Sequence, residues 1–157
     1  MSESLRLIRA DIEDAERIWK MQKEAFASLL ERYQDVELNP ACEPIDKVIM
    51  RLNQKFTYYY LLESEGEIVG AIRVVDKKEE DKRKRISPLF ILPKHWNRGY
   101  AQKAMLLVEE IHGSTGWELD TILQEKGNCY LYEKMGYRAT GKSEIVNEQM
   151  TLVFYEK

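Results

Sequence analysis

Residues that build specialised folds are scarce in this chain. Its 157 residues include two cysteines, two histidines and four prolines. The cysteines, Cys42 and Cys129, stand in unlike contexts, which argues against a disulfide framework and against a metal site. We therefore expect free thiols, no metal and a cytoplasmic location.

Long hydrophobic runs are missing too. No stretch approaches the roughly 20 apolar residues of a membrane span, and the segment from Met1 to Ser4 lacks the basic and apolar regions of a signal peptide. Charge of one sign is not in excess either, because 24 Lys and Arg face 27 Asp and Glu. A nucleic-acid-binding domain is usually strongly basic. These absences predict a protein that binds neither a membrane nor nucleic acid.

What is present fits an ordinary globular chain. Hydrophobic residues make up 44% of it and charged residues 32%, a typical balance. Its length suits one domain with one sizeable core. Apolar periodicity predicts the order strand, two helices, three strands, helix, strand, helix, two strands. The expected helices cover 11–31, 44–54, 102–111 and 126–134, and the expected strands cover 5–9, 56–62, 68–75, 86–92, 117–123, 137–145 and 149–155.

This order indicates a mixed sheet covered by helices, in an α+β (mixed α/β) arrangement. We expect a single domain over 1–157, with successive parts at 1–54, 55–112 and 113–157. The nearly all-charged segment 76–85 reads as a solvated hairpin tip. Contact with an acidic partner, or with the 3′-phosphate of a nucleotide, is the other interpretation of that segment.

The most informative stretch joins the apolar run 86–92 to the helical pattern at 102–111. Between them lies a short loop that contains Arg98-Gly99-Tyr100-Ala101. The first amides of a helix have no partner within it, and the helix dipole adds partial positive charge there. Gly99 lets the backbone come close to a ligand because it has no side chain. The stretch therefore predicts a phosphate-binding site.

Two motifs resemble those of the GCN5-related N-acetyltransferase (GNAT) family. The segment 96–101, Trp-Asn-Arg-Gly-Tyr-Ala, resembles the family's pyrophosphate loop: Gln or Arg, two residues, Gly, one residue, then Gly or Ala. The segment 128–137 is similar to a late signature in which an Asn precedes Tyr-Glu-Lys-x-Gly-Phe/Tyr. The motifs occur in the family's order and at about its separation. The resemblance implies a mostly antiparallel sheet of about seven strands with a splayed pair, flanked by about four helices.

The resemblance also implies acetyl-CoA as the acetyl donor and an amine-bearing molecule as the acceptor. It assigns the pantetheine arm to the backbone of Phe90, Ile91 and Leu92. Asn128 matches the family Asn that bonds the cofactor arm, but its short spacing to Tyr132 fits a helix N-cap equally well. The pyrophosphate would lie against Trp96, Asn97, Arg98, Gly99, Tyr100, Ala101 and Gln102, with Trp96 standing where the family usually has Gln or Arg.

Tyr132 matches the family tyrosine near the thioester sulfur. A phenol with a pKa of about 10 is protonated at neutral pH, so it can donate a proton to a leaving thiolate. Aromatic packing against the sheet is the alternative role. By resemblance, the first two helices and their connection frame the acceptor, where acidic groups would suit a cationic amine. The candidates there are Phe26, Tyr33, Asp35 and Glu37, and the general base is left open among His95, His112, Glu118 and Asp120.

The function predicted from the resemblance is acetyl transfer to a primary amine of a small molecule or peptide, by direct attack in a ternary complex. The alternative is a non-catalytic acyl-CoA-binding module of the same fold. We expect a monomer or a homodimer.

Overall fold

A computed structural model describes residues 4–157; the first three residues of the N-terminal segment considered above lie outside the described part. The strands are β1 (Arg6–Arg9), β2 (Thr57–Ser64), β3 (Glu67–Val75), β4 (Lys84–Ile91), β5 (Trp117–Ile122), β6 (Arg138–Asn147) and β7 (Met150–Glu156). The helices are α1 (Ala15–Tyr33), α2 (Ile45–Asn53), α3 (Tyr100–His112) and α4 (Lys126–Lys134), with short 3-10 helices η1 (Ile12–Asp14), η2 (Pro40–Cys42) and η3 (Pro93–His95).

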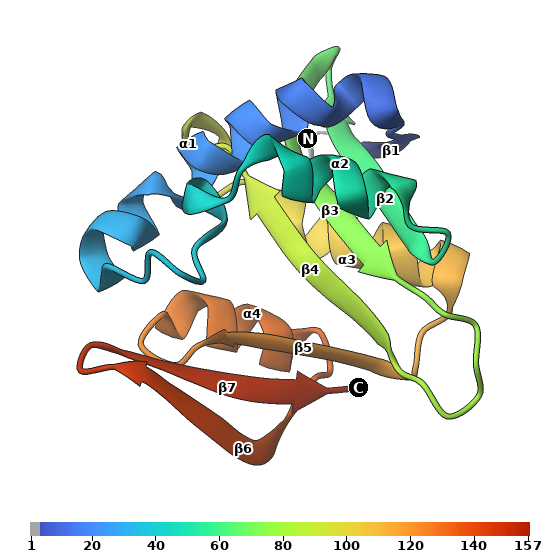
Figure 1. Cartoon of the computed structure of the whole chain (residues 1–157). Helices are drawn as coiled ribbons and strands as arrows, with labels where there is room; N and C mark the ends of the chain where they lie inside the picture. The colour runs from blue at the N-terminus through green and yellow to red at the C-terminus, as the bar shows by residue number, and fades with distance from the viewer. Residues whose placement is uncertain (1–3) are drawn as a thin grey trace.

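The strands form one seven-stranded sheet in the order β1-β2-β3-β4-β5-β7-β6. All neighbours are antiparallel except β4 and β5, which run parallel. In Figure 1, α1 and α2 lie in front of the sheet and α3 lies behind it. The predicted α+β class and order of elements are confirmed.

Each face of the sheet carries its own core. On one face Ile18 of α1 and Val48 of α2, both fully buried, pack against Tyr59 and neighbouring residues of the sheet. On the other face the buried side of α3 packs with Trp117 and with part of α4. Helical spacing of apolar residues explains these contacts, because it gives each helix one apolar stripe to bury.

Several boundaries differ from the predicted ones, for local reasons. Helix α1 runs two residues further than expected, because Tyr33 is buried and continues the helix. Helix α3 begins at Tyr100 and not at residue 102, because Gly99, at φ +78°, ends the loop directly before it. Strand β4 starts at Lys84, and the charged connection is exposed from Lys77 to Arg83.

Strands β4 and β5 separate soon after they begin. Their pairing covers only Lys84 with Trp117 and Arg85 with Glu118. The register between β3 and β4 then shifts, so that Arg73 alone opposes Ser87 and Pro88. Such a bulge bends a strand and increases its twist. The bulge therefore explains why β4 leaves β5 here, and the predicted splayed pair is confirmed (Figure 1).

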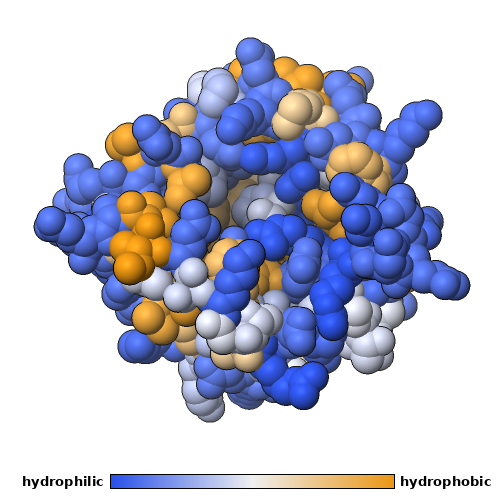
Figure 2. All heavy atoms as spheres, turned by 60° about the horizontal axis from the view of Figure 1, so that its bottom comes forward, coloured by the Kyte–Doolittle hydropathy of each residue, from blue (hydrophilic) through white to orange (hydrophobic). Residues whose placement is uncertain are grey.

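Figure 2 shows the face at the bottom of Figure 1; hydrophilic side chains cover most of it, and its centre is hollowed. Both cysteines are free thiols. Within residues 4–157, no helix combines the length and the apolar character that crossing a membrane requires.

Candidate active site

A cavity of about 550 Å³ opens at the end of β4, where the strand has left β5. Its walls come from α1, β4, the loop after η3, the start of α3, and α4. The residues that line it are Ala25, Phe26, Ser28, Leu29, Arg32, Leu89, Phe90, Ile91, His95, Trp96, Asn97, Arg98, Gly99, Tyr100, Ala101, Gln102, Glu125, Gly127, Asn128, Leu131 and Tyr132.

The predicted phosphate loop lies entirely within this lining. Two of its residues have left-handed backbone conformations, Asn97 at φ +64° and Gly99 at φ +78°. Helix α3 follows directly, and no side chain caps its start. The positive end of a 13-residue helix therefore meets the cavity without a capping side chain. This arrangement can hold an anion such as a phosphate.

Only every second residue of β4 points its backbone N–H and C=O groups into the gap between β4 and β5. The Leu92 amide donates to the Val69 carbonyl at 2.8 Å, so Leu92 pairs with β3 and does not line the cavity. Because antiparallel pairs alternate, the backbone groups of Phe90 also face β3, and those of Leu89 and Ile91 face the opening. Of the three residues whose backbone was predicted to hold the pantetheine arm, Phe90 and Leu92 face β3 and Ile91 faces the opening. Leu89 also faces it and was not predicted; the period of two along the strand is the signal that could have found it.

Tyr132 lies on α4 at the cavity wall and is half-buried. Its ring packs near Tyr137 and Tyr155, with centroids 6.1 and 6.3 Å away. No side chain within residues 4–157 hydrogen-bonds to its hydroxyl. Burial, aided by the charge of Asp120, raises the pKa of Tyr132 to about 12. The hydroxyl is thus a protonated donor at neutral pH.

Asn128 also lines the cavity, as the third residue of α4. The N-cap position of that helix is Glu125, whose carbonyl accepts the Asn128 amide at 3.1 Å. The N-cap interpretation of Asn128 is therefore wrong. Its exposed side chain lies on the same wall as Tyr132.

Of the predicted acceptor residues, only Phe26 reaches the cavity. Tyr33 is buried, and its hydroxyl donates to the Glu125 carboxylate at 2.5 Å. Asp35 is buried and accepts a hydrogen bond of 3.2 Å from Asn39 within the α1–α2 connection. None of these three residues lines the cavity: Tyr33 is held by Glu125, and the chain turns at the left-handed Gln34 before it reaches Asp35 and Glu37.

The candidates for a general base are mostly engaged elsewhere. Asp120 pairs with Arg85 at 2.9 Å, and Glu118 lines a separate depression. His112 is bonded to Tyr60 at 2.9 Å and lies 3.3 Å from Asp76, away from the cavity; its pKa is lowered because burial outweighs the Asp76 carboxylate. Only His95 lines the cavity, and its two ring nitrogens are buried without hydrogen bonds.

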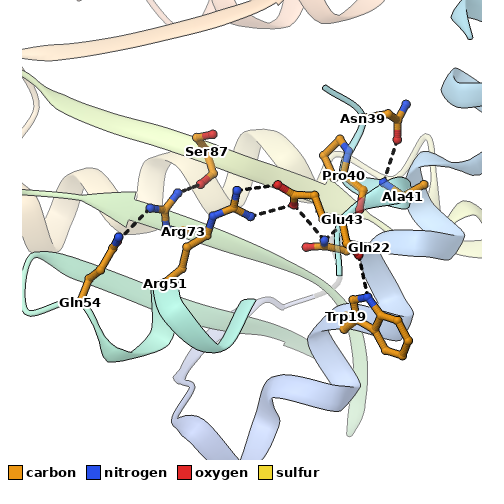
Figure 3. A network of polar contacts seen from close by, with 10 residues as sticks. All are labelled: Trp19, Gln22, Asn39, Pro40, Ala41, Glu43, Arg51, Gln54, Arg73 and Ser87. Atoms are coloured by element: carbon orange, nitrogen blue, oxygen red, sulfur yellow. Dashed lines mark hydrogen bonds and ion pairs between the residues drawn. The ribbon is translucent and has the colours of Figure 1, made fainter. Parts of the chain in front are cut away.

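A polar network behind α1 ties the α1–α2 connection to the sheet (Figure 3). Glu43 accepts two hydrogen bonds from Arg51, at 2.8 and 2.6 Å, and one from Gln22 at 3.1 Å. Burial opposes the ionisation of Glu43, but the hydrogen bonds and charge of Arg51 outweigh it and lower its pKa. Nearby, burial and the charge of Arg51 lower the pKa of Arg73 to about 10. Through Gln22 the network holds α1, which forms one wall of the cavity, against the α1–α2 connection.

Comparisons with known proteins agree with this geometry. The family model for the acetyltransferase (GNAT) family matches residues 16–137. Human N-acetyltransferase 8 is 26% identical over 132 residues, which is 80% of this chain, and the chain spans only 56% of that protein.

Solved structures share the fold at low sequence identity. The spermidine N-acetyltransferase of Vibrio cholerae, in complex with CoA and spermine, has a TM-score of 0.75 at 13% identity, over 96% of this chain and 93% of its own. The microcin C7 self-immunity acetyltransferase, in complex with acetyl-CoA and AMP, has a TM-score of 0.71 at 15% identity, over 98% of this chain and 91% of its own. With a splayed β4, an uncapped helix start beside it and a family match over most of its length, the chain belongs to the acetyltransferase (GNAT) family.

Proposed function

We propose that this protein transfers the acetyl group of acetyl-CoA to a primary amine, in a ternary complex of both substrates. One observation carries the proposal: a single cavity is lined by the uncapped start of α3, by the unpaired side of β4 and by Tyr132. These three features match the needs of the reaction, which are a hold on pyrophosphate, a support for the thioester arm and a proton for the leaving thiolate.

The cofactor would bind along two elements. The loop from Trp96 to Gln102 and the helix dipole of α3 would hold the pyrophosphate. The backbone groups of Leu89 and the amide of Ile91 would pair with the pantetheine amides in the manner of an added strand, while the Ile91 carbonyl accepts from Trp96 Nε1. Asn128, exposed on the α4 wall, would bond the same arm.

In the reaction, the neutral amine nitrogen attacks the thioester carbonyl carbon. A nitrogen–carbon bond forms and the carbon–sulfur bond breaks, giving an amide and a thiolate. The nitrogen loses one proton to solvent, and the Tyr132 hydroxyl gives one proton to the sulfur and is reprotonated from solvent. The raised pKa of Tyr132 keeps its hydroxyl protonated at neutral pH, so that it can donate to the sulfur.

The test is a calorimetric titration of the protein with acetyl-CoA, CoA and NAD, followed by an assay of CoA thiol release with a panel of amines. Binding of acetyl-CoA and CoA, but not NAD, together with amine-dependent thiol release, is the expected result. Binding without release for any amine would favour the acyl-CoA-binding module. Absence of acetyl-CoA binding would refute both functions. A cytoplasmic location, a single domain over 1–157 and a monomeric or homodimeric state stay predictions.

A further inference from the structure

The α1 wall of the cavity is largely uncharged. Ala25, Leu29 and Arg32 recur at helical spacing, with Phe26 and Ser28 beside them. The Phe26 ring packs edge-on against Phe90, with centroids 5.9 Å apart and an interplanar angle of 70°. This part of the wall therefore offers aromatic and aliphatic surface rather than charge.

The one carboxylate among the described lining residues is Glu125, and it is already engaged. It accepts hydrogen bonds from Arg32 Nη1 and from the Tyr33 hydroxyl, each of 2.5 Å. A bound polycation would have to displace Arg32 to use it. The guanidinium of Arg32 already neutralises this carboxylate. Its positive charge at the wall disfavours a polyamine.

From this lining, and resting on the proposed function, we infer that the acceptor is a primary amine carried on an apolar or aromatic group, not a polyamine. The aromatic pair and Leu29 would hold the apolar body by burial. Desolvation in such a pocket disfavours the ammonium form. The bound ammonium would then lose a proton to water more readily. No carboxylate base is needed for this step, and Glu125 is already engaged.

The experiment compares 2-phenylethylamine with spermidine. The full-length protein is assayed for CoA release with each amine, and calorimetry measures binding of each amine to the protein alone and to the CoA-loaded protein. We expect 2-phenylethylamine to have the higher kcat/KM by at least about tenfold, and the tighter binding. Higher kcat/KM or tighter binding for spermidine would overturn the inference.

Two variants on the same helix sharpen the comparison. Ser28→Glu places a carboxylate on an exposed residue of the cavity wall, and Ala27→Glu places one on an exposed residue outside the wall. Ser28→Glu should shift the preference toward spermidine by about tenfold, and Ala27→Glu should leave it unchanged. Equal preferences in both variants would contradict the assignment of this wall to the acceptor.

The outcomes separate the two proposals. If acetyl-CoA does not bind, the proposed function fails, and the amine titrations of the protein alone still decide which chemistry the α1 wall accepts. If acetyl-CoA binds and spermidine is the better acceptor, the proposed function stands and only the inference on acceptor class falls.

Discussion

The indole Nε1 of Trp96 donates a hydrogen bond of 2.7 Å to the backbone carbonyl of Ile91. Ile91 ends β4 on the side that faces the splay, and Trp96 opens the phosphate loop. The residue that departs from the family's usual Gln or Arg therefore ties the loop to the strand. Trp96 is 45% exposed and lines the cavity, so it does this without becoming part of the core.

Replacing Trp96 with Phe keeps an aromatic ring and removes the donor. We expect a loss of about 1 kcal/mol in the free energy of unfolding, the usual net value of one hydrogen bond. Acetyl-CoA should bind no more weakly than before, because the Ile91 carbonyl becomes available to the pantetheine arm. Urea unfolding and calorimetry measure the two quantities. Binding that is tenfold weaker would mean that the indole itself contacts the cofactor.

Replacing Tyr132 with Phe removes the proposed acid and keeps the ring that packs near Tyr137 and Tyr155. We expect kcat to fall by about 10²–10⁴-fold, the range for loss of a general acid, with the Kd for acetyl-CoA unchanged. Tyr130→Phe is the matched control, because Tyr130 lies on the same helix, is 69% exposed and does not line the cavity. Equal kcat in both variants would assign Tyr132 to packing alone.

The raised pKa of Tyr132 predicts the pH dependence. The Tyr132 hydroxyl stays protonated until the pH approaches its pKa of about 12. Deprotonation of Tyr132 should therefore not reduce kcat between pH 7 and pH 10. The same shift affects stability, because burial raises the pKa of Tyr132 in the folded protein above its value in the unfolded chain. The contribution of Tyr132 to the free energy of unfolding is therefore complete below about pH 10. It is lost as the pH rises through about 12. A pH series of kcat and of urea unfolding tests both statements; a descending limb of kcat near pH 8 that disappears in Tyr132→Phe would contradict the assignment.

Gly99 and Gly66 form a matched pair for testing the phosphate loop. Both have left-handed backbone angles, φ +78° and +81°, and an added Cβ would meet no atom within 4 Å at either position. Alanine at either site should cost about 1 kcal/mol of stability. Only Gly99→Ala should weaken acetyl-CoA binding, by about tenfold or more, since Gly66 lies in the β2–β3 turn. Calorimetry on both variants checks this, and equal affinities would place the pyrophosphate elsewhere.

Replacing Glu43 with Gln tests the network behind α1. Glu43 and Arg51 are largely buried, with 14% and 18% of their side chains exposed, so removing the carboxylate leaves the Arg51 guanidinium without a counter-charge, close enough to Arg73 for the two charges to interact. We expect a loss of roughly 3 kcal/mol. Glu16→Gln is the control; Glu16 pairs with Lys20 at the surface with 68% exposure, and its loss should be near zero.

The pH dependence of that network follows from the lowered pKa of Glu43. Its folded pKa lies below the unfolded value, so its contribution is present at neutral pH and is lost as the pH falls through the folded pKa. Acid unfolding of Glu43→Gln should therefore be less steep than that of the wild-type protein. An unchanged acid limb would mean that Glu43 is not ionised in the network.

The loop wall of the cavity was largely predictable. The segment from Trp96 to Gln102 is contiguous, and its shape depends on local backbone angles such as that of Gly99. The wall formed by α1 and α4 was not, because it joins residues far apart in the chain: Arg32 meets Glu125 across 93 positions. Helical spacing predicts that Leu29 and Arg32 share a face of α1 with Ala25. No signal in the nearby sequence predicts that this face meets α4.

The order of elements, the loop before α3 and the place of Tyr132 on α4 were predictable from the amino-acid sequence, because periodicity and short motifs reflect local backbone preferences. Tertiary structure alone decided which side of β4 opens, since that depends on the bulge opposite Arg73 and on the loss of pairing with β5. It also decided that the Tyr33 hydroxyl donates to Glu125 and that Tyr33 does not line the cavity. Both outcomes depend on packing between distant segments, and the free energy of such contacts is not encoded in any one stretch of the chain.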